Sequence, residues 1–353
     1  MLTVLLNTFV FANTAEKAED GKPFDPVPSI MHHIADSHTW HFWGEGHDAV
    51  SLNLPIILWD NGLQEFSSER FIDENHETTK VAESNGNFYR MEHNKIYKTN
   101  AEGKLDELEV DGAHSITNPM PLDFSITKVV AQIILAFVIL LVLGLLSAKS
   151  YKKSQIPTGV ARLIEPLVLF VRDDIALQNI GHVKYKAFTP YLVTLFLFLW
   201  LLNILGLIPG SANVTGNIAI TLVLAVFTMV IVNASGNKTY WMHILDPLGN
   251  SMPVGGKILV YIILIPVELL GIITKPFALM IRLFANMTAG HIVILSLVSL
   301  IYIINSYAIA PVSIALTLFI NVLEVLVAAL QAYIFTLLTS LFIGMAVEEP
   351  HHH

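Results

Sequence analysis

The feature that most constrains this chain is a set of long segments without charged residues. Residues 129–148 and 187–209 contain no acidic, basic or histidine residue. A helix needs about 20 consecutive apolar residues to cross the hydrocarbon core of a bilayer, so each segment is long enough for one crossing. Residues 212–237 are also uncharged, with an apolar centre over 218–232. We therefore predict three spans before the C-terminal third of the chain.

The C-terminal third is poorer still in charge. From 258 to 347, its only acidic, basic or histidine residues are Glu268, Lys275, Arg282, His291 and Glu324. As a helix, the part up to residue 304 would measure roughly 70 Å, more than twice the core thickness of roughly 30 Å. It must therefore tilt, bend or break, and Pro266 and Pro276 are the expected bend points. After a polar break at 305–307, we expect a return helix that ends near residue 347.

Charge divides the chain near residue 125. Residues 1–125 carry 21 of the 29 acidic and 8 of the 20 basic residues, whereas the remainder carries 12 basic and 8 acidic residues. Charged residues make up 14% of the chain, against about 25% in soluble domains. The acidic part would repel phosphates, which argues against nucleic acid as a partner. Cysteine is absent, which excludes disulfides and thiolate metal sites.

Basic residues concentrate in the loop between the first two spans. They are Lys149, Lys152, Lys153, Arg162, Arg172, Lys184 and Lys186. Loops 210–217 and 305–310 carry none. By the positive-inside rule, the basic loop is cytoplasmic, so the acidic N-terminal region lies outside and five crossings bring the C-terminus to the cytoplasm. Within the basic loop, residues 159–180 mix apolar clusters with charges, as in a helix that lies in the membrane interface.

The region before the first span is predicted to form an acidic extracytoplasmic segment, residues 16–124. Residues 1–15 resemble a signal peptide, although no basic residue precedes their apolar core. Alternating patterns over 50–59 and 86–97 predict strands. The terminal histidines 351–353 are either native or a purification tag.

Several histidines crowd one stretch of this segment. They are His32, His33, His38, His41 and His47. Zinc binding and solvated surface histidines are the two interpretations. The spacing is irregular and cysteine is absent, which favours surface histidines and no metal site.

Together these patterns predict an all-α membrane protein with a small mixed or β-containing N-terminal region. The membrane domain covers residues 125–349. It has five crossings, one interfacial amphipathic helix and a long tilted helical hairpin at its C-terminal end.

The ionisable groups inside the last two spans are expected to carry the chemistry, since a charge at the bilayer centre costs roughly 2.5–3.5 kcal/mol. Arg282 lies between two uncharged runs, so it acts as a fixed positive barrier or pairs with a carboxylate from another chain. Asn286 and Ala289 share its face of the helix, where small residues allow a second helix to approach. Lys275 can reach the membrane edge. Glu268, about 21 Å from Arg282 along an ideal helix, either lines an aqueous path or is solvated.

The return helix carries a polar stripe within a sector of about 80°. The stripe consists of Asn321, Glu324, Ala328 and Gln331. In an antiparallel hairpin, Arg282 can lie level with Gln331, and His291 with Glu324. Histidine suits a proton relay because its ordinary pKa is about 6.5. Nine residues place His291 about 180° from Arg282, so both pairs require curvature or a distortion near Gly290.

Three motifs in combination resemble subunit a of F-type ATP synthases. They are KPFALMIRLFANMTAGH (275–291), LQAYIFTLLTSLF (330–342) and LNILGLIPG (202–210). The resemblance covers about residues 125–349 and implies the stator half of a proton path in a bacterial inner membrane. The partners it implies are the c-subunit ring, the b-subunit peripheral stalk, the F1 ATPase sector and the lipid bilayer. It implies no cofactor and no catalytic residue.

The roles of individual residues follow from the resemblance. Arg282 is similar to the arginine that faces the c-ring, with Gln331 and Asn286 as polar neighbours. His291 and Glu324 resemble the pair that lines the outer half-channel. Their order is that of mitochondrial forms, whereas in one common bacterial pattern the carboxylate precedes the histidine. The N-terminal region is longer than is usual for the family.

The expected function is therefore proton translocation by a non-catalytic subunit. A proton would enter through the outer half-channel, ride on a c-ring carboxylate and leave through a cytoplasmic half-channel, where Glu268 resembles an acid of the family. The coupling ion stays open between H⁺ and Na⁺, because the ion-binding carboxylates would lie on the ring. An ion-coupled secondary transporter is the alternative, although no internal repeat with paired broken helices is found. A structural anchor would not need an unpaired intramembrane arginine.

Overall fold

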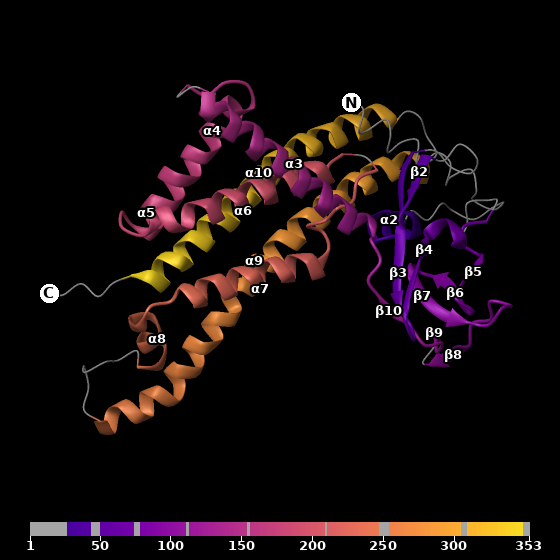
Figure 1. Ribbon diagram of the computed structural model, residues 1–353, viewed down its shortest axis with the longest axis horizontal. Helices are drawn as coiled ribbons and strands as arrows, with labels where there is room; N and C mark the ends of the chain where they lie inside the picture. Colours follow the sequence, from indigo (N-terminus) through magenta and orange to yellow (C-terminus); the bar gives the residue numbers. More distant parts are fainter. Residues whose placement is uncertain are drawn as a thin grey trace. The chain divides into compact units, whose positions relative to one another are not determined.

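The computed structural model describes residues 27–43, 50–73, 78–110, 113–153, 156–208, 210–246, 254–304 and 309–348. The predicted signal segment, His47, the polar break at 305–307 and the terminal histidines lie outside the described residues. The chain divides into two compact units, and Figure 1 gives the element labels. Unit 1 comprises residues 1–134, 205–212 and 291–321, and unit 2 comprises residues 135–204, 213–290 and 322–353.

The N-terminal part of unit 1 is built from short antiparallel strands. Its elements are α2 (Val27–Ile34), β1 (Thr39–Trp43), β2 (Val50–Asn53), β3 (Pro55–Trp59), β4 (Leu63–Ser67), the 3-10 turn η2 (Ser68–Phe71), β5 (Val81–Ser84), β6 (Asn87–Glu92), β7 (Lys95–Thr99), β8 (Glu107–Val110), β9 (Ala113–Ile116) and β10 (Leu122–Asp123). They pair in the orders β1-β2, β10-β3-β4, β5-β6-β7 and β8-β9. The β-containing N-terminal region predicted from the sequence is thus confirmed.

Both segments predicted as strands split into two. In the first, β2 and β3 are separated by Leu54, which is buried and whose N–H donates to Ser68 Oγ at 3.1 Å. In the second, β6 and β7 form a hairpin through His93 and Asn94, both with positive φ. Two successive residues with positive φ are typical of the tight turns that match strand twist. The alternation therefore predicted the strands but not their breaks.

The core of this N-terminal part alternates along the strands. In β3 and β4, buried side chains alternate with more exposed ones, as expected for a sheet with one covered face. The buried cluster consists of Ile56, Leu58, Phe66, Phe71, Ala82, Tyr89, Met91 and Ile96. Its members come from β3, β4, η2, β5, β6 and β7, so one apolar core joins the two three-stranded sheets.

His38 departs from the surface position expected for the histidine-rich stretch. Its side chain is buried, and Nε2 lies 3.1 Å from Asp123 Oδ2. Burial acts to raise the pKa of Asp123, but hydrogen bonds from His38 and Ser125 outweigh it and hold that pKa below its ordinary value. A buried polar group needs such a partner. Among the described residues, no three His, Asp or Glu side chains are grouped closely enough to hold a metal ion.

The described residues that follow β10 are mainly helical. Its elements are α3 (Lys128–Lys153), α4 (Val160–Phe170), the π-helical segment η3 (Val171–Ala176), α5 (Leu177–Ile180), α6 (Tyr185–Gly206), α7 (Ile218–Ser235), α8 (Lys238–Leu245), α9 (Val254–Ile304) and α10 (Ala310–Val347). Among the described residues, five helices are long and apolar enough to cross a membrane, namely α3, α6, α7, α9 and α10. These agree with the five predicted crossings and confirm an all-α membrane protein with an additional N-terminal region.

Helix α9, drawn in orange in Figure 1, is continuous over 51 residues and contains both Pro266 and Pro276. The two prolines therefore do not end the helix. Its ideal length of roughly 75 Å exceeds the bilayer core, so it must tilt or curve to keep its apolar surface in the membrane.

The stretch predicted to lie in the membrane interface is helical, but one side of its second half is buried. Val171 and Ile175 of η3 are fully buried in the apolar core of unit 2, with Leu199 of α6 and Phe335 of α10. Ser340 Oγ also donates to the Ile175 carbonyl at 3.2 Å. This segment therefore packs against spans as well as carrying the exposed charged pair Arg172 and Asp173.

Candidate functional site

Arg282 lies on α9, and no acidic side chain in the described ranges is paired with it. Its neighbours Leu279 and Leu283 are buried, whereas Arg282 itself is only partly buried. Within the described part of the chain, Arg282 makes no ion pair, and no hydrogen bond joins it to Gln331. A guanidinium does not lose its proton in proteins, so Arg282 carries a permanent positive charge that these residues do not compensate.

The face of α9 next to Arg282 is open and lined by small side chains. Its exposed members include Ala278, Ala285, Asn286 and Ala289. The spacing of three to four residues places them on one stripe of the helix. Small residues allow close approach of another transmembrane helix, so this stripe is suited to contact with a helix from outside the chain.

Glu324 lies inside unit 2, and its carboxylate rests against Gly290. A Cβ at residue 290 would lie 1.8 Å from Glu324 Oε1 and 2.8 Å from its carboxyl carbon. Both carboxylate oxygens are buried and have no hydrogen-bond partner among the described residues. Helices α9 and α10 therefore meet antiparallel at this point, within one residue of the depth predicted for His291 and Glu324. Helix α9 remains α-helical through Gly290.

The polar stripe predicted on α10 faces inward. Glu324, Ala328 and Gln331 are all buried, with exposed fractions of 7%, 0% and 4%. The amide nitrogen of Asn321 is also buried and without a hydrogen-bond partner in the described residues. Buried polar atoms of this kind need water or a proton-carrying neighbour to avoid a desolvation cost of about 1–3 kcal/mol. The arrangement is therefore suited to hold water.

His291, in the part of α9 that belongs to unit 1, has a similar environment. Its Nε2 is buried and has no hydrogen-bond partner among the described residues. Like the carboxylate oxygens of Glu324, this nitrogen lacks the hydrogen-bond partner that a buried polar atom needs.

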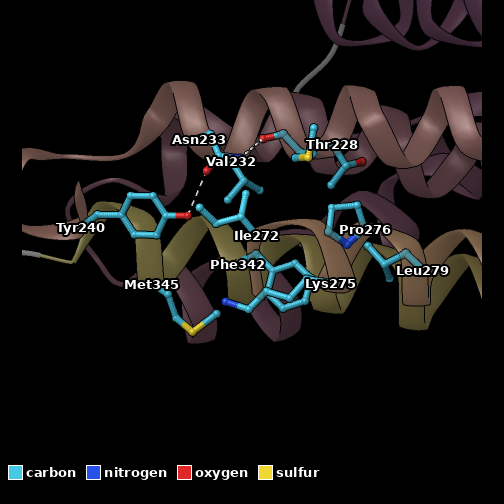
Figure 2. Close-up of a pocket in the computed structure, with 11 residues that line it drawn as sticks. Thr228, Val232, Asn233, Tyr240, Ile272, Lys275, Pro276, Leu279, Phe342 and Met345 are labelled. Atoms are coloured by element: carbon cyan, nitrogen blue, oxygen red, sulfur yellow. Dashed lines mark hydrogen bonds between the residues drawn. The ribbon is translucent and has the colours of Figure 1, made fainter. Parts of the chain in front are cut away.

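Glu268 is half-buried on α9, near a small pocket between α7, α9 and α10. Burial, followed by the charge of Glu268, raises the pKa of the Tyr240 hydroxyl in α8. Figure 2 shows this hydroxyl directed at Asn233, to whose Oδ1 it donates at 3.0 Å. The amine of Lys275 lies 5.4 Å from the ring centre of Phe342. The pocket has room for about one water molecule, and Tyr240 and Lys275 are among the residues that line it.

A further polar network was not predicted from the sequence. Asn203 of α6 is fully buried; its Nδ2 donates to the Ala328 carbonyl at 3.2 Å, and its Oδ1 accepts from Thr215 Oγ1 at 2.8 Å. Asn213 Nδ2 donates to the Met287 carbonyl at 3.4 Å. The only signal for this network was the asparagine in the LNILGLIPG motif, whose partners lie far away in the sequence.

The fold and the intramembrane groups define a multi-pass membrane protein with ionisable side chains inside its spans. Comparisons with known proteins are more specific. The family model described as ATP synthase A chain matches residues 129–344, well over half of the chain. The chain therefore belongs to the ATP synthase A chain family and is a subunit of the membrane sector of an ATP synthase. A second model, a domain of unknown function (DUF8433), matches residues 29–124.

Curated relatives agree with this assignment. ATP synthase subunit a of Chloroherpeton thalassium is 50% identical over 251 residues, which cover 70% of this chain and 72% of the relative. ATP synthase subunit a 2 of Chlorobium luteolum is 48% identical over 242 residues, covering 65% and 70%. ATP synthase subunit a 2 of Chlorobaculum tepidum is 47% identical over 261 residues, covering 71% and 69%. These matches favour the ATP synthase subunit over a secondary transporter.

Proposed function

We propose that this chain is the proton-translocating stator subunit of the synthase, non-catalytic itself, with two half-channels that lead to and from the carboxylates of a c-subunit ring. The observation that carries the proposal is Arg282, a permanent charge that makes no ion pair with any carboxylate among the described residues. A charge held in an apolar span is costly, and an acidic side chain on a partner helix would compensate it. The open stripe of small residues around Arg282 supports the approach of such a helix.

The half-channels are assigned to the buried polar groups on either side of Arg282. His291 and Glu324 line the outer path, a role supported by their buried atoms without hydrogen-bond partners. Glu268 lies on the cytoplasmic path, supported by the pocket near Tyr240 and Lys275. Arg282, with Asn286 and Gln331 as polar neighbours, separates the two paths, because its positive charge attracts a deprotonated carboxylate and repels a free proton.

The proposal also fixes orientation and partners. The membrane domain, residues 125–349, lies in a bacterial inner membrane with the C-terminus in the cytoplasm. The N-terminal region, residues 16–124, lies in the periplasm, following the signal segment 1–15. Besides the c-ring, the partners are the b-subunit peripheral stalk and, through the complex, the F1 sector. The basic loop between α3 and α6 supports this orientation.

Replacing Arg282 tests the function. In inverted membrane vesicles, Arg282→Ala is expected to abolish ATP-driven acidification, because nothing then attracts the ring carboxylate or blocks leakage. Arg282→Lys should lose most activity, since an ammonium lacks the planar fork of guanidinium and can lose its proton when desolvated. The control is Lys152→Ala, which removes an exposed cation from α3, outside the proposed half-channels, and should retain most pumping in equal amounts of assembled complex.

The measurement separates the proposal from the transporter alternative. Acidification near the wild-type level in Arg282→Ala, with normal assembly, would contradict the proposed role. A secondary transporter would also be purified without a ring of small hairpin proteins and without a soluble ATPase.

A further inference from the structure

The segment that joins α6 to α7 is held by an aromatic residue of the N-terminal region. Trp40 of β1 donates its indole N–H to the Gly210 carbonyl at 2.8 Å. The Trp40 side chain is 9% exposed and stacks on Phe42, with ring centres 5.2 Å apart. A hydrogen bond inside such an apolar contact is shielded from competing water. The contact therefore fixes Gly210 to β1.

Gly210 fits this contact because it has no side chain. Its φ is +78°, in the region that favours glycine. A Cβ would lie 2.8 Å from the Phe42 carbonyl oxygen and 3.0 Å from the Phe42 Cα. Both obstacles are backbone atoms and cannot rotate away, so any larger residue would push the segment off β1.

A second anchor comes from the first span. Gln132 of α3 is fully buried, and its Oε1 accepts hydrogen bonds from Ser211 Oγ and the Ala212 N–H, both at 2.6 Å. Residues 210, 211 and 212 are thus held in succession. The first turn of α3 is itself tied to the N-terminal region, because the backbone N–H of Lys128 donates to the Ser37 carbonyl at 2.9 Å. The two anchors and the segment all belong to unit 1.

The residues that follow directly in the chain contact the helices of the candidate site. Asn213 donates to the carbonyl of Met287, which is next to Asn286. Thr215 donates to Asn203, which in turn donates to the carbonyl of Ala328. Ala328 lies one turn after Glu324 on the buried stripe of α10. These contacts lie within unit 2, and the single peptide bond between Ala212 and Asn213 links them to the anchors.

We propose that the N-terminal region positions the α6–α7 segment, with Trp40, Gly210 and Gln132 as positioning residues, and so holds Asn213 and Thr215 in place beside the buried polar stripe of α10. This gives the region matched by a domain of unknown function a role in ion translocation. The consequence for ion flow depends on the proposed function, whereas the anchoring itself does not.

The test uses the full chain in its assembled complex and two tryptophan variants. Trp40→Phe keeps the ring but removes the N–H donor. Trp59→Phe is the matched control, because Trp59 lies in β3 of the same region and is 56% exposed. Since the chain has no cysteine, Ile208→Cys, at an exposed position of the segment, accepts one spin label that reports on its mobility.

We expect Trp40→Phe to increase spin-label mobility and Trp59→Phe to leave it unchanged. Loss of one net hydrogen bond corresponds to about a two- to tenfold larger population of the released segment. Passive proton conduction per assembled complex, measured after removal of the soluble ATPase, should fall and its pH profile should shift. Gly210→Ala should have the same effects. A role in assembly alone would lower the amount of complex without shifting the pH profile.

Three results would overturn the inference: unchanged mobility in Trp40→Phe, equal changes in Trp59→Phe, or greater mobility with wild-type conduction and pH profile. Failure of the proposed function is recognised separately, since Arg282→Ala would then pump normally whether or not the segment is anchored.

Discussion

A missing side chain at residue 290 makes room for the carboxylate of Glu324. At this position a Cβ would lie 1.8 Å from Glu324 Oε1, which is a steric clash, whereas the hydrogen of Gly290 leaves room for the oxygen. Because the carboxylate belongs to a buried face of α10, it has little freedom to move away. A Cβ at residue 290 would therefore force the buried Glu324 side chain to shift.

We expect Gly290→Ala to displace Glu324 and lower ATP-driven proton pumping at least several-fold, because overpacking of this kind typically costs about 1–3 kcal/mol. Gly271→Ala is the matched control on the same helix, since a Cβ there meets no atom within 4 Å. Alanine is the better helix former, so the control should assemble at least as well as the wild type. The measurement that checks this prediction is ATP-driven proton pumping per assembled complex in both variants. Equal activity of the two variants would show that Glu324 is not constrained by residue 290.

At the scale of elements, a charged group joins two sheets of the N-terminal region. Asp60, directly after β3, accepts from Lys98 Nζ of β7 at 2.7 Å and from the Tyr89 hydroxyl of β6 at 3.0 Å. The hydrogen bond from Lys98 is the main cause that holds the pKa of Asp60 below its ordinary value, against the opposing effect of burial. Burial and the bond to Asp60 raise the pKa of Tyr89 to about 12.

The sign of the pH dependence follows from these directions. A carboxylate whose pKa is lower in the folded than in the unfolded state stabilises the fold above its unfolded pKa, near 4. The contribution is lost as the pH falls through the folded pKa. Tyr89 acts in the opposite sense, since its stabilisation is complete below about pH 10 and is lost as the pH rises through about 12.

Asp60→Asn is therefore expected to lower the free energy of unfolding of the N-terminal region by about 1–3 kcal/mol at neutral pH, and by progressively less as the pH falls below about 4. Proteolysis in increasing urea, with thermolysin at neutral pH and pepsin in acid, measures the difference in the membrane-bound chain. The control is Asp106→Asn, at an exposed aspartate with no ion pair among the described residues. It should leave the free energy of unfolding unchanged at both pH values. If Asp60→Asn lowered the free energy of unfolding by the same amount at both pH values, the assigned role of the carboxylate would be contradicted.

The sequence predicted the long helices but not where the short strands break, and the reason is physical. A membrane-spanning helix is recognisable from about twenty consecutive apolar residues, so all five long helices could be placed without knowledge of their neighbours. By contrast, the break between β2 and β3 depends on the Ser68 hydroxyl that bonds Leu54 from fourteen residues away. The burial of η3 likewise depends on α6 and α10, which the local pattern of alternating charges does not reveal.

The residues of the candidate site were likewise predicted only in part. Arg282, His291 and Glu324 were identified because ionisable residues are rare in spans. Gly290 and Trp40 carry no such signal, since each matters only through a distant backbone or side chain that it meets in the fold. The proposed roles in proton transfer remain predictions that the experiments above test.

At the scale of the whole molecule, the absence of cysteine allows the predicted topology to be tested position by position. We expect Val183→Cys, 87% exposed between α5 and α6, to react with a membrane-impermeant maleimide only in inverted vesicles. Glu348→Cys, just after α10, should behave alike, because five crossings place the basic loop and the C-terminus on the same side. Glu102→Cys, exposed in the N-terminal region, should react only from the periplasmic side, because long acidic segments are translocated and basic loops are retained. Labelling of Glu102→Cys and Glu348→Cys from one side would contradict five crossings. A full reversal of all three would instead exchange the outer and cytoplasmic half-channels, placing Glu268 on the periplasmic path.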